Sequence, residues 1–268
     1  MIDLPIRHIL FPYDFSIQGQ RAAEYVAAFA KRFDARVTML TVVPAGDAPQ
    51  LNLERALSAE FADVNLERVA DHGDAARRVA EFAHNRGVDM VMMPTHGLGL
   101  FRTLLSGSVT STVIHDVLCP VWTAAHADSQ HAPAIPRRIL CAVDASNEGV
   151  RLLQHAALFS KRVGAALSVL HVAEPGSDWP SFWSERELQD NIRETAAQAI
   201  ESMLAAAGVE ATTRVVVGGL TERAAEAARA DNVDLVIVGR GAIREPFAHL
   251  RTHVFGIVEQ SPCPVLSV

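Results

Sequence analysis

The sequence predicts an α/β fold of two tandem domains, each a doubly wound parallel sheet. Two observations carry this prediction: the chain repeats itself at the spacing of a whole domain, and each copy alternates short apolar strands with amphipathic helices. Strands separated by helices of about 10 to 15 residues favour parallel pairing through right-handed crossovers. A chain of 268 residues is long enough for two domains of ordinary size.

The repeat begins at the first strand, where Arg7–Asp14 matches Arg137–Asp144 at an offset of 130 (137 − 7). The offset reaches 145 at Val88 (233 − 88) and is 144 at Cys119 (263 − 119). The increase falls between the second and third strands, so we expect a longer insert there in the second copy. This pattern indicates duplication of a whole domain.

Each copy predicts the same series of elements. In the first copy we expect helices at 18–33, 74–86 and 107–116, and strands at 9–11, 36–43, 64–70, 90–93 and 121–123. The second copy repeats the plan, with its insert forming a helix at 184–207. Residues 124–136, with two prolines, read as a linker with a boundary near residue 130. We therefore expect domains at 1–128 and 137–268.

Composition narrows the function classes. The net charge of −7 makes a nucleic-acid partner unexpected. No apolar run approaches the ~20 residues of a membrane-spanning helix, and the N-terminus lacks the features of a signal peptide, so no membrane partner is expected. Three widely spaced cysteines, Cys119, Cys141 and Cys263, offer no C-x-x-C pair and predict inert thiols in a cytoplasmic protein.

Enzyme signatures are missing from the sequence. Neither lysine follows a glycine, so there is no P-loop, and there is no G-x-S-x-G elbow. His249 and His253 share a helix face but have no evident third metal ligand, and His96 has no paired nucleophile. We assign no catalytic residue and no metal site, and expect at most slow ATP hydrolysis.

One stretch nevertheless predicts a binding site for an anion. The apolar strand 90–93 leads through Pro94 and Gly97 to Gly107-Ser108, which opens a helix. The first N–H groups of a helix have no partner within it, and its dipole is positive at that end. The glycines let the backbone approach a ligand closely, so the stretch is typical of a phosphate cradle.

The spacing of this stretch resembles the nucleotide-binding signature of the universal stress protein (UspA) family, G-x2-G-x9-G-[S/T], with Pro94 at the first glycine. Pro12-Tyr13-Asp14-Phe15-Ser16 is similar to the family's Pro-x-Asp-x-Ser element, and Cys119-Pro120-Val121 to its last strand. The resemblance implies a tandem protein with Rossmann-like, adenine-nucleotide-hydrolase-like domains and a regulatory or stress-response role. It also implies ATP, or AMP or ADP, as ligand, with or without Mg²⁺.

The resemblance and the strand ends together give a candidate site in the first copy. Asp14 would hold a ribose hydroxyl or, through water, Mg²⁺, although with Ser16 it also suits a turn cap. Val42 and Met93 would flank adenine, in addition to packing in the core. The Ser108 and Thr110 hydroxyls could donate to phosphate. The expected nucleotide-binding residues are Pro12, Asp14, Ser16, Val42, Met93, Pro94, Gly97, Gly107, Ser108, Val109 and Thr110.

The second copy departs from the signature. Ala242 replaces a glycine, and Arg251-Thr252 stands where the first copy has Gly107-Ser108. A guanidinium there would fill the phosphate volume, and we expect Arg251 to pair with an acidic neighbour such as Asp144. The degenerate second site comprises Asp144, Gly239, Gly241, Arg251 and Thr252.

Three further expectations concern assembly and rival functions. The final strands, 121–123 and 265–268, could pair within the chain, which would give an intrachain pseudo-dimer; any further homodimer would use other surfaces. A nucleotide-free interaction module is one alternative function. A slow ATPase switch is another.

Overall fold

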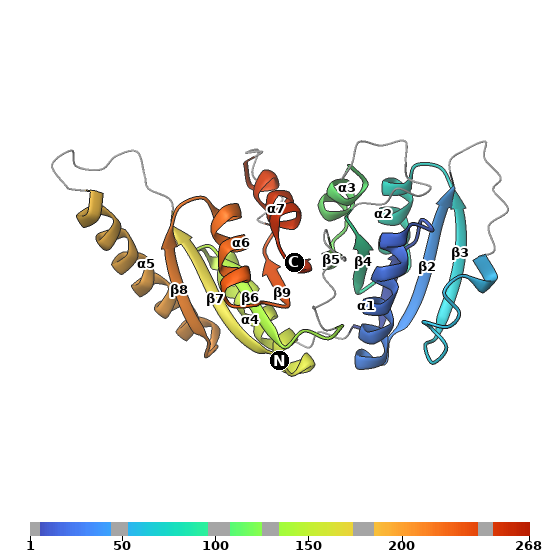
Figure 1. Cartoon of the computed structure of the whole chain (residues 1–268), viewed down its shortest axis with the longest axis horizontal. Helices are drawn as coiled ribbons and strands as arrows, with labels where there is room; N and C mark the ends of the chain where they lie inside the picture. The colour runs from blue at the N-terminus through green and yellow to red at the C-terminus, as the bar shows by residue number, and fades with distance from the viewer. Residues whose placement is uncertain (1–5, 44–52, 96–107, 125–133, 174–184, 241–248) are drawn as a thin grey trace. The chain divides into compact units, whose positions relative to one another are not determined.

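The computed structural model describes residues 6–43, 53–95, 108–124, 134–173, 185–240 and 249–268 (Figure 1). The chain divides into two compact units, Met1–Ile135 with Leu266–Val268 and Pro136–Val265. Each unit is α/β with parallel strands, so the predicted fold class is confirmed. Within the described residues, no helix is long and apolar enough to cross a membrane.

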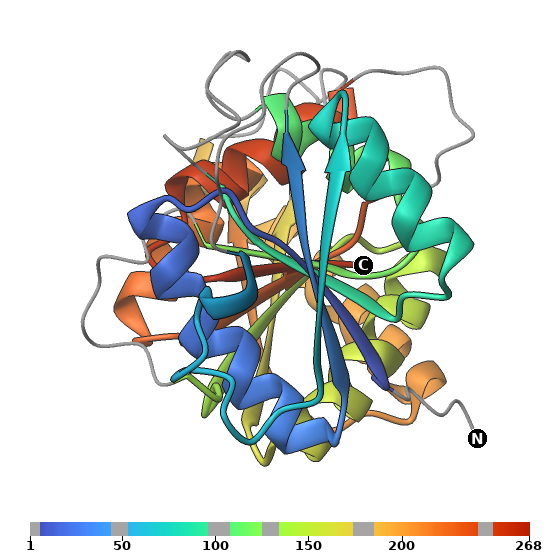
Figure 2. The same ribbon diagram turned by 90° about the vertical axis from the view of Figure 1, so that its right-hand side faces the viewer.

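The first unit has the strand order β3-β2-β1-β4-β5. Its strands are β1 (His8–Pro12), β2 (Arg36–Val43), β3 (Leu66–His72), β4 (Met90–Pro94) and β5 (Val121–Ala124). Its helices are α1 (Ile17–Phe33), α2 (Ala75–Asn85) and α3 (Ser108–Asp116), with a short 3-10 helix at Leu53–Arg55. Helices α1 and α2 cover opposite faces of the sheet (Figure 2). The order reverses between β1 and β4, which is where open α/β sheets bind ligands.

The helices of this unit begin and end as their sequences dictate. One face of α1 packs into the core, with Ala22 and Val26 fully buried. Ser16 caps its N-terminus and Asp34, in the left-handed region at φ 54°, ends it. Asp74 caps α2 by accepting a hydrogen bond from the Arg77 backbone N–H at 2.9 Å.

The second unit repeats this arrangement, with strand order β10-β9-β6-β7-β8. Its strands are β6 (Arg138–Val143), β7 (Ala166–Ala173), β8 (Thr212–Val217), β9 (Leu235–Val238) and the beginning of β10 (Val265–Ser267). Within β10, Val265 belongs to this unit, and Leu266 and Ser267 belong to the first. Its helices are α4 (Asn147–Val163), α5 (Glu185–Ala207), α6 (Leu220–Ala230) and α7 (His249–Gln260). The predicted insert is α5, which buries Ile192, Ile200 and Met203.

The two units share a set of hydrogen bonds at the start of their first strand, which supports the duplication. The Asp89 carboxylate accepts hydrogen bonds from the backbone N–H groups of Arg7 and His8 at 2.8 and 2.9 Å. Asp234 accepts the corresponding bonds from Arg137 and Arg138, both at 2.9 Å. In each unit, therefore, the corresponding aspartate holds the start of the first strand through two backbone hydrogen bonds. These bonds lie at the end of the sheet opposite to the candidate site.

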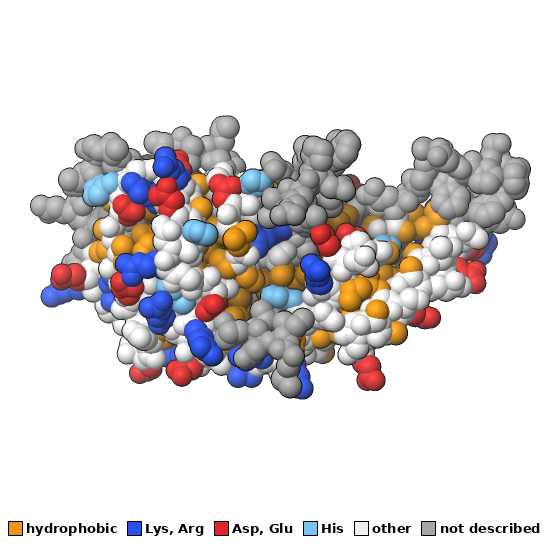
Figure 3. All heavy atoms as spheres, turned by 180° about the vertical axis from the view of Figure 1, so that it is seen from behind, with side chains coloured by type: hydrophobic (Ala, Val, Ile, Leu, Met, Phe, Trp, Pro, Cys, Tyr) orange, Lys and Arg blue, Asp and Glu red, His pale blue; other side chains and the backbone are white. Residues whose placement is uncertain are grey.

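Charged side chains of both signs are interspersed on the described part of the face in Figure 3. On α2, Arg77 and Arg78 both bond the Glu81 carboxylate, at 2.7 and 3.1 Å. The basic pair at 77–78 is thus neutralised locally. A phosphate backbone would need a concentration of unpaired basic groups, which this helix does not offer.

Candidate functional site

The turn after β1 is built by two side chains. Asp14 is buried, at 2% exposure, and its Oδ1 accepts a hydrogen bond from the Ser16 backbone N–H at 3.0 Å. The Ser16 hydroxyl oxygen accepts from the Gly19 N–H at 2.9 Å. A Cβ on Gly19 would lie 3.1 Å from Asp14 Oδ1, so glycine lets the carboxylate sit against α1. The Pro-x-Asp-x-Ser element therefore fixes a carboxylate at a strand end, as well as capping the helix.

Backbone strain lies next to this carboxylate. Phe15 has φ 61°, in the left-handed region that costs a residue other than glycine roughly 1–2 kcal/mol. Its ring packs against the Tyr13 ring, with centroids 4.7 Å apart. Burial raises the pKa of the Tyr13 phenol, with a further contribution from the charge of Asp14, so the phenol stays neutral. Strain of this kind is concentrated at functional sites.

The end of β4 is fastened to the first turn of α3 by Thr110. Its hydroxyl lies 3.4 Å from the Pro94 carbonyl oxygen and 3.3 Å from that of Thr95, and donates to them. The hydroxyl carries one proton, and here Thr110 uses it to hold the helix to the end of β4; its expected bond to phosphate stays a prediction. The Thr95 hydroxyl differs from that of Thr110, because Thr95 Oγ1 is buried and has no hydrogen-bond partner among the described residues.

The strand order brings the ends of β1, β2 and β4 together. Asp14, Val42 and Met93 lie at these ends and are all buried, at 2%, 1% and 3% exposure. Pro12 and Pro94 end their strands, and Val109 is buried in α3. Gly97, Gly107, His96 and the Ser108 side chain lie outside the described residues. The phosphate loop therefore stays a prediction.

The second unit has the same turn after its first strand, but the aspartate of this turn differs in solvent exposure. Asp144 Oδ1 accepts hydrogen bonds from the Ser146 N–H at 3.3 Å and from the Ser146 hydroxyl at 2.5 Å. The Ser146 hydroxyl oxygen accepts in turn from the Gly149 N–H at 3.3 Å. Asp144, however, is exposed where Asp14 is buried. A carboxylate held in the same way thus faces solvent in this unit.

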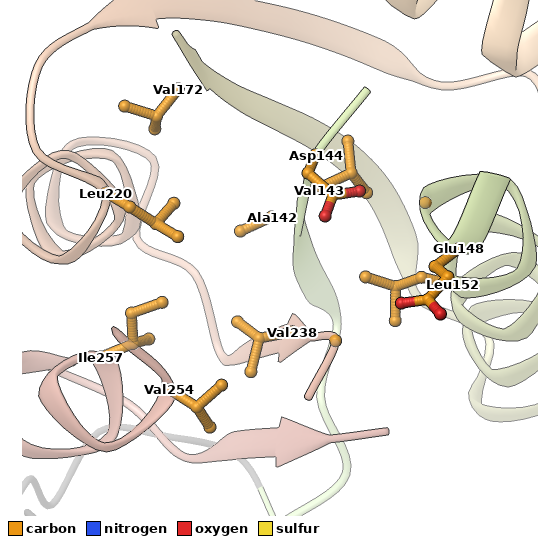
Figure 4. A pocket seen from close by; sticks show the side chains of 12 residues that line it. Ala142, Val143, Asp144, Glu148, Leu152, Val172, Leu220, Val238, Val254 and Ile257 are labelled. Carbon is orange, nitrogen blue, oxygen red and sulfur yellow. The ribbon is translucent and has the colours of Figure 1, made fainter. Parts of the chain in front are cut away.

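A cavity of about 110 Å³ opens beside Asp144 at the ends of β6, β7 and β9 (Figure 4). Its wall includes Asp144, Val172, Val238 and Gly239, the counterparts of Asp14, Val42, Met93 and Pro94. The remaining described residues in its wall are Ala142, Val143, Glu148, Gly149, Leu152, Leu220, Val254 and Ile257. The structure therefore brings these counterparts together around an open space in the copy whose signature is degenerate.

Sequence reasoning missed this cavity, although a signal was present. Val143 and Ala145 stand where the first copy has Tyr13 and Phe15, so two aromatic rings are missing from the turn of the second unit. Reasoning from the glycine signature alone gave these positions no weight.

Other predictions for this unit lie beyond the described part of the chain. Gly241, and the side chains of Arg251, Thr252, His249 and His253, are outside the described residues. The expected ion pair between Arg251 and Asp144 therefore stays a prediction. Among the residues that the structure describes, no group of three or more His, Cys, Asp or Glu side chains could hold a metal ion.

Comparisons with known proteins place this fold in a family. The universal stress protein family model matches residues 5–124 and 136–268. The universal stress protein Slr1230 of Synechocystis sp. is 27% identical over 123 residues, which cover 44% of this chain and 42% of that protein. Sll1654 of the same organism is 30% identical over 128 residues, covering 42% of this chain and 82% of that protein.

A solved structure extends the likeness in fold to almost the full chain. The crystal structure of a universal stress protein from Archaeoglobus fulgidus matches with a TM-score of 0.71 and 21% identity. The match covers 99% of this chain and 97% of that one. Because the family model matches both copies, the chain belongs to the universal stress protein family.

Proposed function

We propose that the first unit binds ATP or another adenine nucleotide and that the protein serves a regulatory, stress-response role in the cytoplasm. The observation that carries this proposal is the buried Thr95 hydroxyl, which has no hydrogen-bond partner among the described residues. An unsatisfied buried donor costs about 1–3 kcal/mol. A phosphate oxygen held between β4 and α3 would accept its proton.

The neighbouring groups suit the other parts of such a ligand. Asp14 supplies a fixed carboxylate for a ribose hydroxyl, and the strained Phe15 beside it is consistent with a turn shaped for binding. Val42 and Met93 would flank the adenine ring. The backbone N–H groups near Gly97 and Gly107 would hold the phosphates. Mg²⁺, where present, would accompany the phosphates. Asp14 is the one carboxylate among the expected nucleotide-binding residues.

The rival function is an interaction module without nucleotide, and one observation favours it. Asp14, Val42 and Met93 are each exposed by no more than 3%, so a ligand must displace whatever covers them. A nucleotide-binding protein would undergo this local opening. An interaction module would have no need to.

Binding of a fluorescent ATP analogue separates the two functions. The wild-type protein should bind it, and Gly107→Asp should abolish binding by placing a carboxylate in the phosphate volume. Thr95→Val should weaken binding about tenfold, the effect of losing one hydrogen bond to a charged group. The control is Thr38→Val, because Thr38 lies in the same sheet and bonds His8 and Glu67 instead. Failure of the wild-type protein to bind would favour the interaction module.

A further inference from the structure

The cavity of the second unit has one apolar side and one acidic side. Figure 4 shows Leu220, Val254 and Ile257 on one side, and the Asp144 and Glu148 carboxylates on the other. Asp144 and Glu148 are both exposed, so these carboxylates lie at the mouth. The cavity therefore combines a hydrophobic wall with a negatively charged entrance.

Both carboxylates have capacity for a ligand. The hydrogen bonds of Asp144 use Oδ1, and within the described part of the chain neither its Oδ2 nor the Glu148 carboxylate has a partner. Glu148 stands where the first copy has Gln18, so this entrance carries a charge that the first unit lacks. The described residues that line the cavity include no Lys or Arg. Among these described residues the charge pattern disfavours a phosphate and favours a cation, which would compete with the Arg251 guanidinium expected at Asp144.

The volume limits the apolar part of the occupant. An apolar cavity of roughly 150 Å³ is enough to bind benzene. The present cavity of about 110 Å³ suits a smaller group, such as a short branched alkyl chain. Such a group would gain from removing its surface from water, while an ammonium head at the mouth could donate three hydrogen bonds to the carboxylates.

We propose that this cavity binds a small primary alkylammonium ion, with its charge between Asp144 and Glu148 and its alkyl group against Leu220 and Val254. The site differs from the proposed nucleotide site in its unit, its charge and its ligand class. It therefore stands or falls independently of the nucleotide assignment.

The probe is isopentylammonium chloride, titrated into the full-length protein and followed by NMR. Isopentanol and 4-methylpentanoate are the neutral and anionic comparisons. The ammonium ion should bind about fivefold more tightly than the alcohol, the contribution of two exposed ion pairs, and the carboxylate more weakly than the alcohol. Raising the salt concentration should reduce the advantage of the ammonium ion. Equal affinity for ammonium and alcohol would overturn the proposal.

Variants locate the site. The double variant Asp144→Asn/Glu148→Gln should lose the fivefold advantage and bind isopentanol as before. Leu220→Trp should fill the cavity and abolish binding of both compounds. Glu201→Gln, which removes an exposed carboxylate from α5, should change nothing. Circular dichroism of each variant confirms that it is folded.

Two results would contradict this location. One is ammonium binding that survives Leu220→Trp. The other is displacement of the ammonium ion by ATP in the Gly107→Asp protein, because the first site is disabled there and ATP would have to occupy the second-unit cavity. If ammonium binding is unchanged in Gly107→Asp, the two sites are independent, as proposed.

Discussion

The two units build the same turn after their first strand and use it differently. In both, an aspartate oxygen accepts from the serine two residues later, and that serine caps the following helix. Asp14 nevertheless lies buried, whereas Asp144 lies exposed beside a cavity. Duplication has thus kept the backbone device and changed the volume of the side chains around it. Whether a strand end is open to a ligand depends on those side chains.

The helix glycine of each turn shows the same difference. A Cβ on Gly19 would lie 3.1 Å from the Tyr13 ring and from Asp14 Oδ1. A Cβ on Gly149 would lie 2.3 Å from the Asp144 backbone oxygen and 3.0 Å from Met203 Sδ. Gly149 therefore faces Met203 of the α5 insert, whereas its counterpart Gly19 faces the Tyr13 ring.

The largest expected effect comes from filling these glycines. Gly149→Ala should destabilise the second unit by about 3 kcal/mol, because the backbone oxygen cannot yield as a side chain can. Gly19→Ala should cost about 1 kcal/mol or less, since helix propensity offsets part of the crowding. Hydrogen–deuterium exchange, followed by mass spectrometry of peptides from each unit, measures both. Equal losses would show that the two turns are not different in this way.

A half-buried histidine should make the second unit sensitive to acid. Burial lowers the pKa of His155 to about 4. The first unit has Tyr25 at the corresponding position, and the Tyr25 and Trp122 ring centroids lie 5.1 Å apart. Between pH 6.5 and 4 the unfolded chain binds the proton and the folded one does not, so stability falls as the pH drops. With partial exposure of the ring discounted, the loss is about 2 kcal/mol.

His155→Phe tests this expectation. The variant should remove the loss of stability in the second unit between pH 6.5 and 4. His84→Gln, at an exposed position in α2, should not. The readout is the exchange of the second unit at several pH values, and an unchanged acid sensitivity in His155→Phe would contradict the assignment.

Two threonines of the first unit should respond in opposite ways to the same substitution. The Thr41 hydroxyl donates to the Tyr13 carbonyl oxygen at 3.0 Å, so Thr41→Val should cost about 1 kcal/mol. Thr95→Val removes a hydroxyl without a partner in the described structure, and should leave the ligand-free protein equally stable or more stable. Thermal denaturation after removal of ligands measures both. A loss at Thr95 as large as that at Thr41 would mean that its hydroxyl is already satisfied.

The smallest expected difference is between the two helix caps. Ser16 is buried, and its bond to Gly19 is shorter than that of Ser146 to Gly149, at 2.9 against 3.3 Å. Ser16→Ala should therefore cost about 1.5 kcal/mol and Ser146→Ala about 0.5 kcal/mol. Exchange of the α1 and α4 peptides gives the two values. The reverse order would show that burial does not set the strength of the cap.

The sequence was sufficient for the fold because periodicity, capping residues and repeat offsets are local. Helix α1 was expected from residue 18 and begins at Ile17, and the insert helix was expected at 184–207 and spans Glu185–Ala207. The family resemblance is confirmed by the matches to both copies. These features depend on residue order along the chain and on little else.

The details of the sites depend on contacts between elements. The proton of Thr110 goes to the carbonyl oxygens of Pro94 and Thr95 at the end of β4, which residue spacing cannot specify. The volume of the second-unit cavity is set by side chains contributed by several strands and helices. The signature glycines carry no information on the combined volume of these side chains. A cavity in the degenerate copy was therefore not expected.

The central claim is that the first unit holds an adenine nucleotide. Mass spectrometry of small molecules released by denaturing freshly purified protein tests it most directly, in wild type and in Gly107→Asp, with Arg251→Ala as the matched change in the second copy. The account predicts an adenine nucleotide at about one per chain from wild type and Arg251→Ala, and none from Gly107→Asp. Release of equal amounts from wild type and Gly107→Asp would contradict it.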